Sequence, residues 1–302
     1  MKQLPVELRD TRCSYCDGPL GRAIRAIDRN RRITNESFFY GECLVCGSYT
    51  LTNPPADMGI YYPEDYVSWR SRDQLRASHK AEGYRLSFLE RHGIGPEANI
   101  LEIGPGDGLF ASMAIDAGMT VSVIERTEDA CKRLSQLLGV TTIATDDPRV
   151  ALETTGKLDA VVGWHVIEHL PNPGGVLDAA AQALRPGGLL LLAAPNPRSR
   201  SFSIMRNSWP HVDAPRHLTL PDASGICSRL ASTMDLVEIS DLDPGSLYWE
   251  GFAWHYLVRR PSTPRRIDAG LALAGAVAGK LSNVTDWRPL KGACYTIVLR
   301  RK

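Results

Sequence analysis

The chain has 302 residues, of which 43% are hydrophobic and 23% charged, and its formal net charge is +1. This length is enough for one large domain plus a small one. The near-neutral net charge gives no indication of a polyanionic partner. The longest apolar stretch near the C-terminus, 271–279, is far too short to span a bilayer, and the polar start 1–12 is unlike an export signal. We therefore expect a cytoplasmic protein.

Two pairs of cysteines mark the N-terminal segment. Cys13 and Cys16 form one Cys-x-x-Cys pair, and Cys43 and Cys46 form another about thirty residues later. This spacing is typical of zinc ligands, and the rival interpretation as disulfides is disfavoured in a chain without an export signal. Residues 1–52 hold too few apolar side chains for a core of their own, so a bound ion would supply the missing folding energy. We predict a zinc-ribbon-like module with structural Zn²⁺, including short strands near 24–27 and 37–40.

Residues 53–98 are predicted to link this module to the rest of the chain. The aromatic run 61–69 would either stack on a bound sugar or aromatic ring, or pack the ribbon against the core. A helical pattern then extends over 72–91.

A glycine-rich turn follows the first strongly apolar run. The residues 99–103 are typical of a buried parallel strand, and 109–117 of a helix. Three glycines lie between them, at Gly104, Gly106 and Gly108, where they permit close approach of a ligand to the backbone. A dinucleotide is one candidate ligand, but Glu102 in the strand and Asp107 in the turn would repel phosphates. These acids favour a cationic or zwitterionic ligand.

A second acid, Glu125, ends the next predicted strand, 120–124, where a carboxylate can accept hydrogen bonds from both hydroxyls of a ribose. Strands and helices then alternate. Further strands are expected at 141–145, 158–164, 189–193, 236–239 and 295–299, and helices at 128–138, 174–185 and 221–234. The pattern predicts an α/β fold with a doubly wound sheet. Residues 246–290 are interpreted as an insertion that covers the core or, alternatively, forms a lid or a contact with a membrane surface. Its apolar residues at helical spacing are Ile267, Leu271, Ala274, Val277, Ala278 and Leu281.

Four motifs occur in one order: LEIGPGDG at 101–108, Glu125, HVIEHLP at 165–171 and LRPGG at 184–188. This order resembles the class I S-adenosylmethionine-dependent methyltransferases. The resemblance implies a seven-stranded Rossmann-like sheet in a core spanning 99–302, and S-adenosylmethionine as cofactor. It implies these cofactor-binding residues, with Asp146 near the adenine: Glu102, Gly104, Gly106, Asp107, Gly108, Glu125, Arg126, Asp146 and His165.

The same resemblance places the methyl acceptor beyond the fourth and fifth strands. Candidate catalytic residues there are His169, His217, His211 and Glu168, because a histidine titrates near neutral pH and can take a proton from an O- or N-acceptor. Each histidine can equally be a hydrogen-bonded structural residue. Arg216 would either hold an anionic acceptor or form an intramolecular ion pair.

The cysteine module followed by a tyrosine-rich segment resembles the zinc-containing sugar methyltransferases of bacterial antibiotic and surface-polysaccharide pathways. We therefore expect methyl transfer to a small molecule, a sugar or another secondary metabolite, with nucleic acid not a partner. Two alternatives stay open. One is an RNA base methyltransferase with a zinc-binding recognition module, although residues 1–60 carry eight basic against seven acidic residues, a poor balance for tracking phosphates. The other is a protein that binds S-adenosylmethionine without catalysis.

Overall fold

A seven-stranded sheet forms the centre of the computed structural model, which describes residues 12–63, 66–258, 270–271, 273–275, 277 and 290–302. The strand order is β10-β11-β8-β7-β4-β5-β6. All neighbouring pairs among β4 to β8 are parallel, whereas β11 is antiparallel to both of its neighbours. The expected doubly wound α/β fold is confirmed. Its strands are β4 (Asn99–Ile103), β5 (Thr120–Glu125), β6 (Thr141–Ala144), β7 (Leu158–Trp164), β8 (Leu184–Pro195), β10 (Met234–Ser240) and β11 (Cys294–Arg301).

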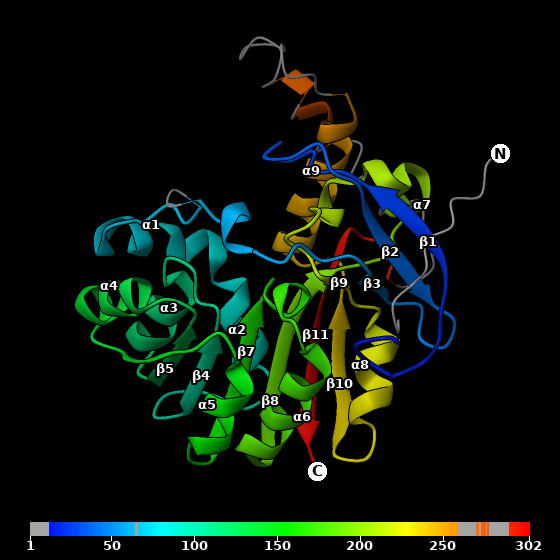
Figure 1. Ribbon diagram of the computed structural model, residues 1–302. Coiled ribbons are helices and arrows are strands. Elements are labelled where there is room, and N and C mark those ends of the chain that lie inside the picture. The colour runs from blue at the N-terminus through cyan, green and yellow to red at the C-terminus, as the bar shows by residue number, and fades with distance from the viewer. Residues whose placement is uncertain (1–11, 64–65, 259–269, 272, 276, 278–289) are drawn as a thin grey trace, which may run out of the picture.

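Helices cover both faces of this sheet (Figure 1). Successive side chains of β4 point to opposite faces, so Ile100 and Leu101 are both fully buried but belong to different hydrophobic clusters. The Ile100 cluster includes α1 (Arg72–Glu82), α2 (Tyr84–Glu90), α3 (Leu109–Asp116) and α4 (Glu128–Leu138). The Leu101 cluster includes α5 (Pro148–Thr154), α6 (Pro173–Ala183) and α8 (Ala223–Leu230). Among the described residues, no helix is both long and apolar enough to cross a membrane.

The N-terminal ribbon is a second, smaller sheet, whose order is β1-β2-β3-β9. Three strands come from the N-terminal segment: β1 (Leu20–Ala26), β2 (Phe38–Cys43) and β3 (Tyr49–Leu51). The fourth, β9 (Thr219–Leu220), comes from the long connection after β8 and pairs antiparallel with β3. The Tyr15 hydroxyl lies 2.8 Å from the Thr219 hydroxyl and strengthens the same junction. The ribbon is therefore built into the core fold by main-chain pairing (Figure 1).

Several elements differ from expectation. The helix expected over 72–91 is two helices: α1 ends at Glu82 and α2 starts at Tyr84, with Gly83 between them. The LRPGG motif at 184–188 lies within β8, which was expected to begin only at 189, and its first residue, Leu184, pairs with Leu158 of β7. The connection after β8 contains a short helix and two 3-10 turns before β9: α7 (Arg200–Met205), η3 (Arg206–Ser208) and η4 (Pro210–Val212). Further 3-10 turns are η1 (Gly59–Tyr61) and η2 (Ile167–His169).

The expected insertion begins with a helix, α9 (Pro244–Val258). Of the apolar residues expected at helical spacing beyond it, Leu271, Ala274 and Val277 are helical. The other three, Ile267, Ala278 and Leu281, lie outside the described residues.

Candidate active site

The glycine turn after β4 leaves room for a ligand. Gly104 and Gly106 have φ angles of +63° and +58°, a backbone region that side chains with a Cβ rarely adopt. A Cβ on Gly104 would lie 2.5 Å from the Val166 side chain, so only glycine fits there. A Cβ on Gly106 would meet no described heavy atom within 4 Å. The turn therefore packs tightly on one side and faces open space at Gly106.

The acids around the turn differ in their surroundings. Glu102 is only 2% exposed, and its Oε2 has no hydrogen-bond partner among the described residues. Burial raises the pKa of Glu102 to about 8. Asp107 instead forms an ion pair with Arg70, whose Nε lies 2.5 Å from Oδ2. Glu102 is thus a buried carboxyl with an unmatched oxygen beside the glycine turn.

The second acid lies at the same edge of the sheet. Glu125 ends β5, and one of its side-chain oxygens accepts a 2.7 Å hydrogen bond from the Arg126 amide. Burial raises the pKa of Glu125 above its ordinary value. The Arg126 guanidinium lies over the Tyr62 ring, 4.9 Å from its centre. Because β5 and β7 flank β4 in parallel, Glu125, Gly104 and His165 all follow the carboxyl ends of adjacent strands.

Asp146 also follows a strand at this edge, β6. It is exposed and lines a small cavity of about 280 Å³ together with the first turns of α5 and α6. The neighbouring Asp147 caps α5, accepting a hydrogen bond from the Arg149 amide.

A larger cavity of about 920 Å³ lies between the ribbon, the linker, the core loops and α9. All four candidate catalytic residues line it, and so does His165. The complete lining is Asn30, Arg31, Ile33, Ile60, Pro63, Tyr66, His165, Glu168, His169, Pro195, Pro210, His211, Asp213, Arg216, His217, Trp249, Phe252 and Tyr256.

Glu168 lies at the centre of the histidines. It is fully buried, and its Oε1 is 3.6 Å from His165 Nδ1 and 4.0 Å from His217 Nε2. Burial alone would raise its pKa, but interactions with His165, His217 and His169 outweigh burial and lower it. Glu168 is therefore a buried carboxylate with imidazoles at ion-pair distance and without a hydrogen-bond partner among the described residues.

Backbone carbonyls orient three of the imidazoles. The Nδ1–H of His169 donates to the Arg216 carbonyl at 3.0 Å, and that of His217 donates to the His211 carbonyl at 2.8 Å. The Nε2–H of His211 donates to the Trp249 carbonyl at 3.1 Å. A carbonyl can only accept, so in the neutral form of each ring the opposite nitrogen carries the lone pair. Burial lowers the pKa of His169 to about 4 and that of His211 to about 3, so both rings are neutral at pH 7.

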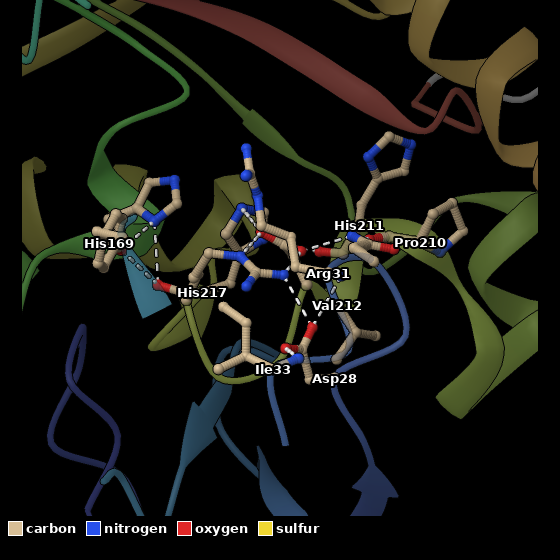
Figure 2. A network of polar contacts seen from close by, with 12 residues as sticks. Asp28, Arg31, Ile33, His169, Pro210, His211, Val212 and His217 are labelled. Atoms are coloured by element: carbon tan, nitrogen blue, oxygen red, sulfur yellow. Dashed lines mark hydrogen bonds and ion pairs between the residues drawn. The ribbon is translucent and has the colours of Figure 1, made fainter. Parts of the chain in front are cut away.

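Arg216 forms the intramolecular ion pair that was one of its two expected roles. Its guanidinium is 1% exposed and bonds Asp213 at 2.7 and 2.9 Å. It also bonds Asp28 at 3.1 Å, on the loop between β1 and β2 (Figure 2). The ribbon thus contributes a buried charge directly beneath the histidine cluster.

Several lining residues were not expected from the sequence. Asn30, Arg31 and Ile33 come from the ribbon, and no local pattern marks them. Trp249 and Phe252 come from α9, where the aromatic run 248–256 was a usable signal. In the linker, Tyr61 packs edge-on against Phe38 of the ribbon, which agrees with its expected packing role, and Tyr66 lines the cavity.

The four N-terminal cysteines converge, and their sulfur atoms all lie within 4.8 Å of one another. Cys13 Sγ is 3.5 Å from Cys46 Sγ, and Cys16 Sγ is 3.4 Å from Cys43 Sγ. The Tyr15 and Val45 amides each donate a hydrogen bond of 3.4 Å to a cysteine sulfur. Such amide donors stabilise thiolates, and the donor set suits tetrahedral Zn²⁺.

The sheet order, the antiparallel last strand and the glycine turn after β4 define the class of S-adenosylmethionine-dependent methyltransferases. Residues 72–233 match a family model described as a methyltransferase domain. That stretch is more than half of the chain, and the chain belongs to this methyltransferase family.

Two curated proteins that share one name are similar to this chain. The "Ubiquinone biosynthesis O-methyltransferase" of Xanthomonas oryzae pv. oryzae is 28% identical over 142 residues, which are 45% of this chain and 59% of that protein. The protein of the same name from Idiomarina loihiensis is 29% identical over 152 residues, 48% of this chain and 62% of that protein. The chain thus spans about three fifths of the curated relatives that it matches.

Solved structures share the fold. A putative sarcosine dimethylglycine methyltransferase from Galdieria sulphuraria superposes with a TM-score of 0.50 at 15% identity, covering 78% of this chain and 91% of that chain. A mycolic acid cyclopropane synthase solved with S-adenosylhomocysteine has a TM-score of 0.50 at 11% identity, covering 74% and 85%.

Proposed function

We propose that this protein transfers a methyl group from S-adenosylmethionine to a small molecule, a sugar or another secondary-metabolite intermediate, bound in the 920 Å³ cavity. One observation carries the proposal. The segment 165–169, directly after β7, begins at the cofactor edge of the sheet and ends in the cavity, so methyl donor and acceptor would meet there. Holding the acceptor atom in line with the sulfonium methyl, with water excluded, is the main task of such a site.

The residues at the sheet edge fit the cofactor. S-adenosylmethionine supplies an electrophilic methyl group on a sulfonium, and the buried oxygen of Glu102 and the open backbone at Gly106 suit the cationic part of this ligand. Glu125 would accept hydrogen bonds from the ribose hydroxyls, with Arg126 and Asp146 nearer the adenosine end. Gly104, Gly108, Asp107 and His165 would shape the turn and the wall of the site.

Glu168, His169, His217 and His211 would form the acceptor-activating end of the cavity. An O- or N-acceptor must lose a proton at or before transfer, and this cluster offers imidazole lone pairs beside a buried carboxylate. The curated relatives are named O-methyltransferases, which favours oxygen as the acceptor atom here.

The division of labour along the chain follows from this proposal. Residues 1–52 would be a module held by one structural Zn²⁺ on Cys13, Cys16, Cys43 and Cys46; 53–98 would be the linker and first helices, and 99–302 the catalytic core. Thiols placed for a metal rather than for disulfides favour a reducing compartment, as expected for a cytoplasmic protein.

The test is transfer of an isotope-labelled methyl group. The purified protein is titrated with S-adenosylhomocysteine by calorimetry and then incubated with methyl-labelled S-adenosylmethionine and a panel of hydroxylated sugars and phenols. We expect one binding site per chain and label in at least one product. Binding without label in any product would favour a non-catalytic protein, and absence of binding would contradict the proposal.

A further inference from the structure

The buried carboxylate at the base of the cavity is short of partners. Glu168 has no exposed surface, and neither of its side-chain oxygens has a hydrogen-bond partner within the described ranges. A buried ion without compensation is costly, so such groups are normally paired or bind a metal. His165 Nδ1 and His217 Nε2 lie 3.6 and 4.0 Å from its Oε1, beyond hydrogen-bond distance.

Two imidazoles lie beside this carboxylate. His169 and His217 each use Nδ1–H to donate to a backbone carbonyl, so in the neutral ring Nε2 is the nitrogen free to bind a metal. The Tyr62 hydroxyl lies 3.0 Å from His169 Nδ1 and donates to the same carbonyl as this nitrogen. An imidazole whose second nitrogen donates to a carbonyl is the usual arrangement of a metal ligand, because that bond fixes the ring and its tautomer.

The three groups converge. One ligand atom from each of Glu168, His169 and His217 can be chosen so that all lie within 4.8 Å of one another (Figure 2 shows the two histidines). Bonds of about 2.0–2.2 Å would bring such atoms onto one ion after a small inward movement.

The local charge favours a cation. Glu168, Asp213 and Asp28 are three carboxylates, and Arg216 is the guanidinium that bonds two of them, so these four side chains carry a net charge of −2. A second guanidinium lining the cavity, Arg31, lies 4.8 Å from the centre of the Tyr66 ring and changes the sum to −1. In either count the carboxylates outnumber the guanidinium groups.

We propose that Glu168, His169 and His217 bind a divalent cation whose open coordination positions face the cavity and hold two adjacent oxygens of the acceptor. Two imidazoles and one carboxylate suit transition-metal ions such as Zn²⁺ or Mn²⁺, and three protein ligands leave room for others. The acceptor class is then a vicinal diol, a catechol or a hydroxy-ketone. This acceptor part rests on the proposed function, whereas cation binding itself does not.

Mn²⁺ is the probe, because thiolates select Zn²⁺ and leave Mn²⁺ to nitrogen and oxygen ligands. The full-length protein, its cysteines saturated with Zn²⁺, is titrated with MnCl₂ while the EPR signal of free Mn²⁺ is followed. We expect one Mn²⁺ per chain. We expect binding to weaken in Glu168→Gln and His217→Ala by at least the roughly 10–100-fold that loss of a supporting residue causes. The exposed Asp235→Asn serves as the matched carboxylate control and should bind as the wild type does.

The zinc content of the wild-type protein, measured after saturation with Zn²⁺ and dialysis, is a second test that needs no variant. Two Zn²⁺ per chain agree with the proposal. It fails if the wild-type protein binds neither Mn²⁺ nor a second Zn²⁺, or if binding survives both substitutions in folded protein.

Catechol and phenol separate the acceptor class from cation binding. Catechol should displace water from bound Mn²⁺ and lower the relaxation enhancement of water protons, and phenol should not. Equal behaviour of the two would overturn the chelated-acceptor part. Calorimetry with S-adenosylhomocysteine on the metal-free and Mn²⁺-loaded protein reports on the proposed function separately, because loss of the cation should leave cofactor binding intact.

Discussion

The cofactor edge and the acceptor cavity are built in opposite ways. The residues proposed to bind the cofactor come mostly from one continuous strand-turn-helix-strand unit, 99–126, whose parallel pairing places Gly104 and Glu125 side by side. The cavity collects side chains from the ribbon, the linker, two core loops and α9. A site made from contiguous residues can be recognised in a sequence. A site assembled from distant segments takes its shape from the whole fold, and it is the part free to differ between proteins that share a core.

The largest effect is expected from the cysteine site, because the ribbon that a bound ion would hold together forms one wall of the cavity. Cys43→Ser should remove the bound zinc, and structural zinc contributes on the order of 10 kcal/mol to small modules. The loop carrying Asp28, Asn30 and Arg31 would then leave the cavity, so methyl transfer should be lost. Affinity for S-adenosylhomocysteine should stay within about three-fold, because no cofactor residue lies in the ribbon.

Metal analysis and calorimetry on the same samples check this. Cys227→Ser, in α8, is the control and should keep its zinc. If Cys43→Ser abolished cofactor binding as well, the cofactor edge would depend on the ribbon, and the contrast between it and the acceptor cavity would be wrong.

The histidine cluster should affect turnover alone. His217→Ala removes a lone pair beside Glu168, and we expect a fall in kcat of about 10²–10⁴-fold, the usual range for a group that activates an acceptor. Cofactor affinity should stay nearly unchanged. Steady-state kinetics with calorimetry measures both. His92→Ala, which removes a contact to Glu238 outside the cavity, should leave kcat as it is.

Glu125 tests the cofactor edge. Glu125→Ala removes the acceptor for the ribose hydroxyls, and two hydrogen bonds to a charged group correspond to a loss of about 100-fold or more in affinity. Titration with S-adenosylhomocysteine measures it, with the exposed Glu128→Ala three residues later as control. Equal affinities for both variants would remove Glu125 from the site.

The last prediction concerns Glu102 and the pH dependence of stability. Its pKa is about 8 in the folded protein against an ordinary value of 4.5, so the folded state binds more protons between these values. The stabilisation is therefore present at low pH and declines as pH rises from about 4.5 to 8, by at most about 1.4 kcal/mol per unit of pKa difference. Urea unfolding of the unliganded protein across this range should show the decline, and Glu102→Gln should reduce it. If the wild-type protein and Glu102→Gln showed the same dependence of unfolding free energy on pH, Glu102 would not be a buried carboxyl with a raised pKa.

The sequence allowed much of the core to be predicted, and the reason is local. Ile100 to Glu125 carry the apolar runs, the glycines and the terminal acid that specify their own structure. Arg216 shows the limit. Two roles stayed open because its second partner, Asp28, is 188 residues away and meets it only through the pairing of β3 with β9. The role of α9 was missed for the same reason, since Trp249 faces histidines from two other segments.

A crystal structure with S-adenosylhomocysteine tests most directly whether the two regions form one methyl-transfer site. We predict the ribose hydroxyls within hydrogen-bond distance of Glu125, the homocysteine part over Gly106, and the sulfur facing the cavity that holds His169 and His217. A ligand bound with its sulfur turned away from that cavity, or bound elsewhere on the chain, would contradict the account.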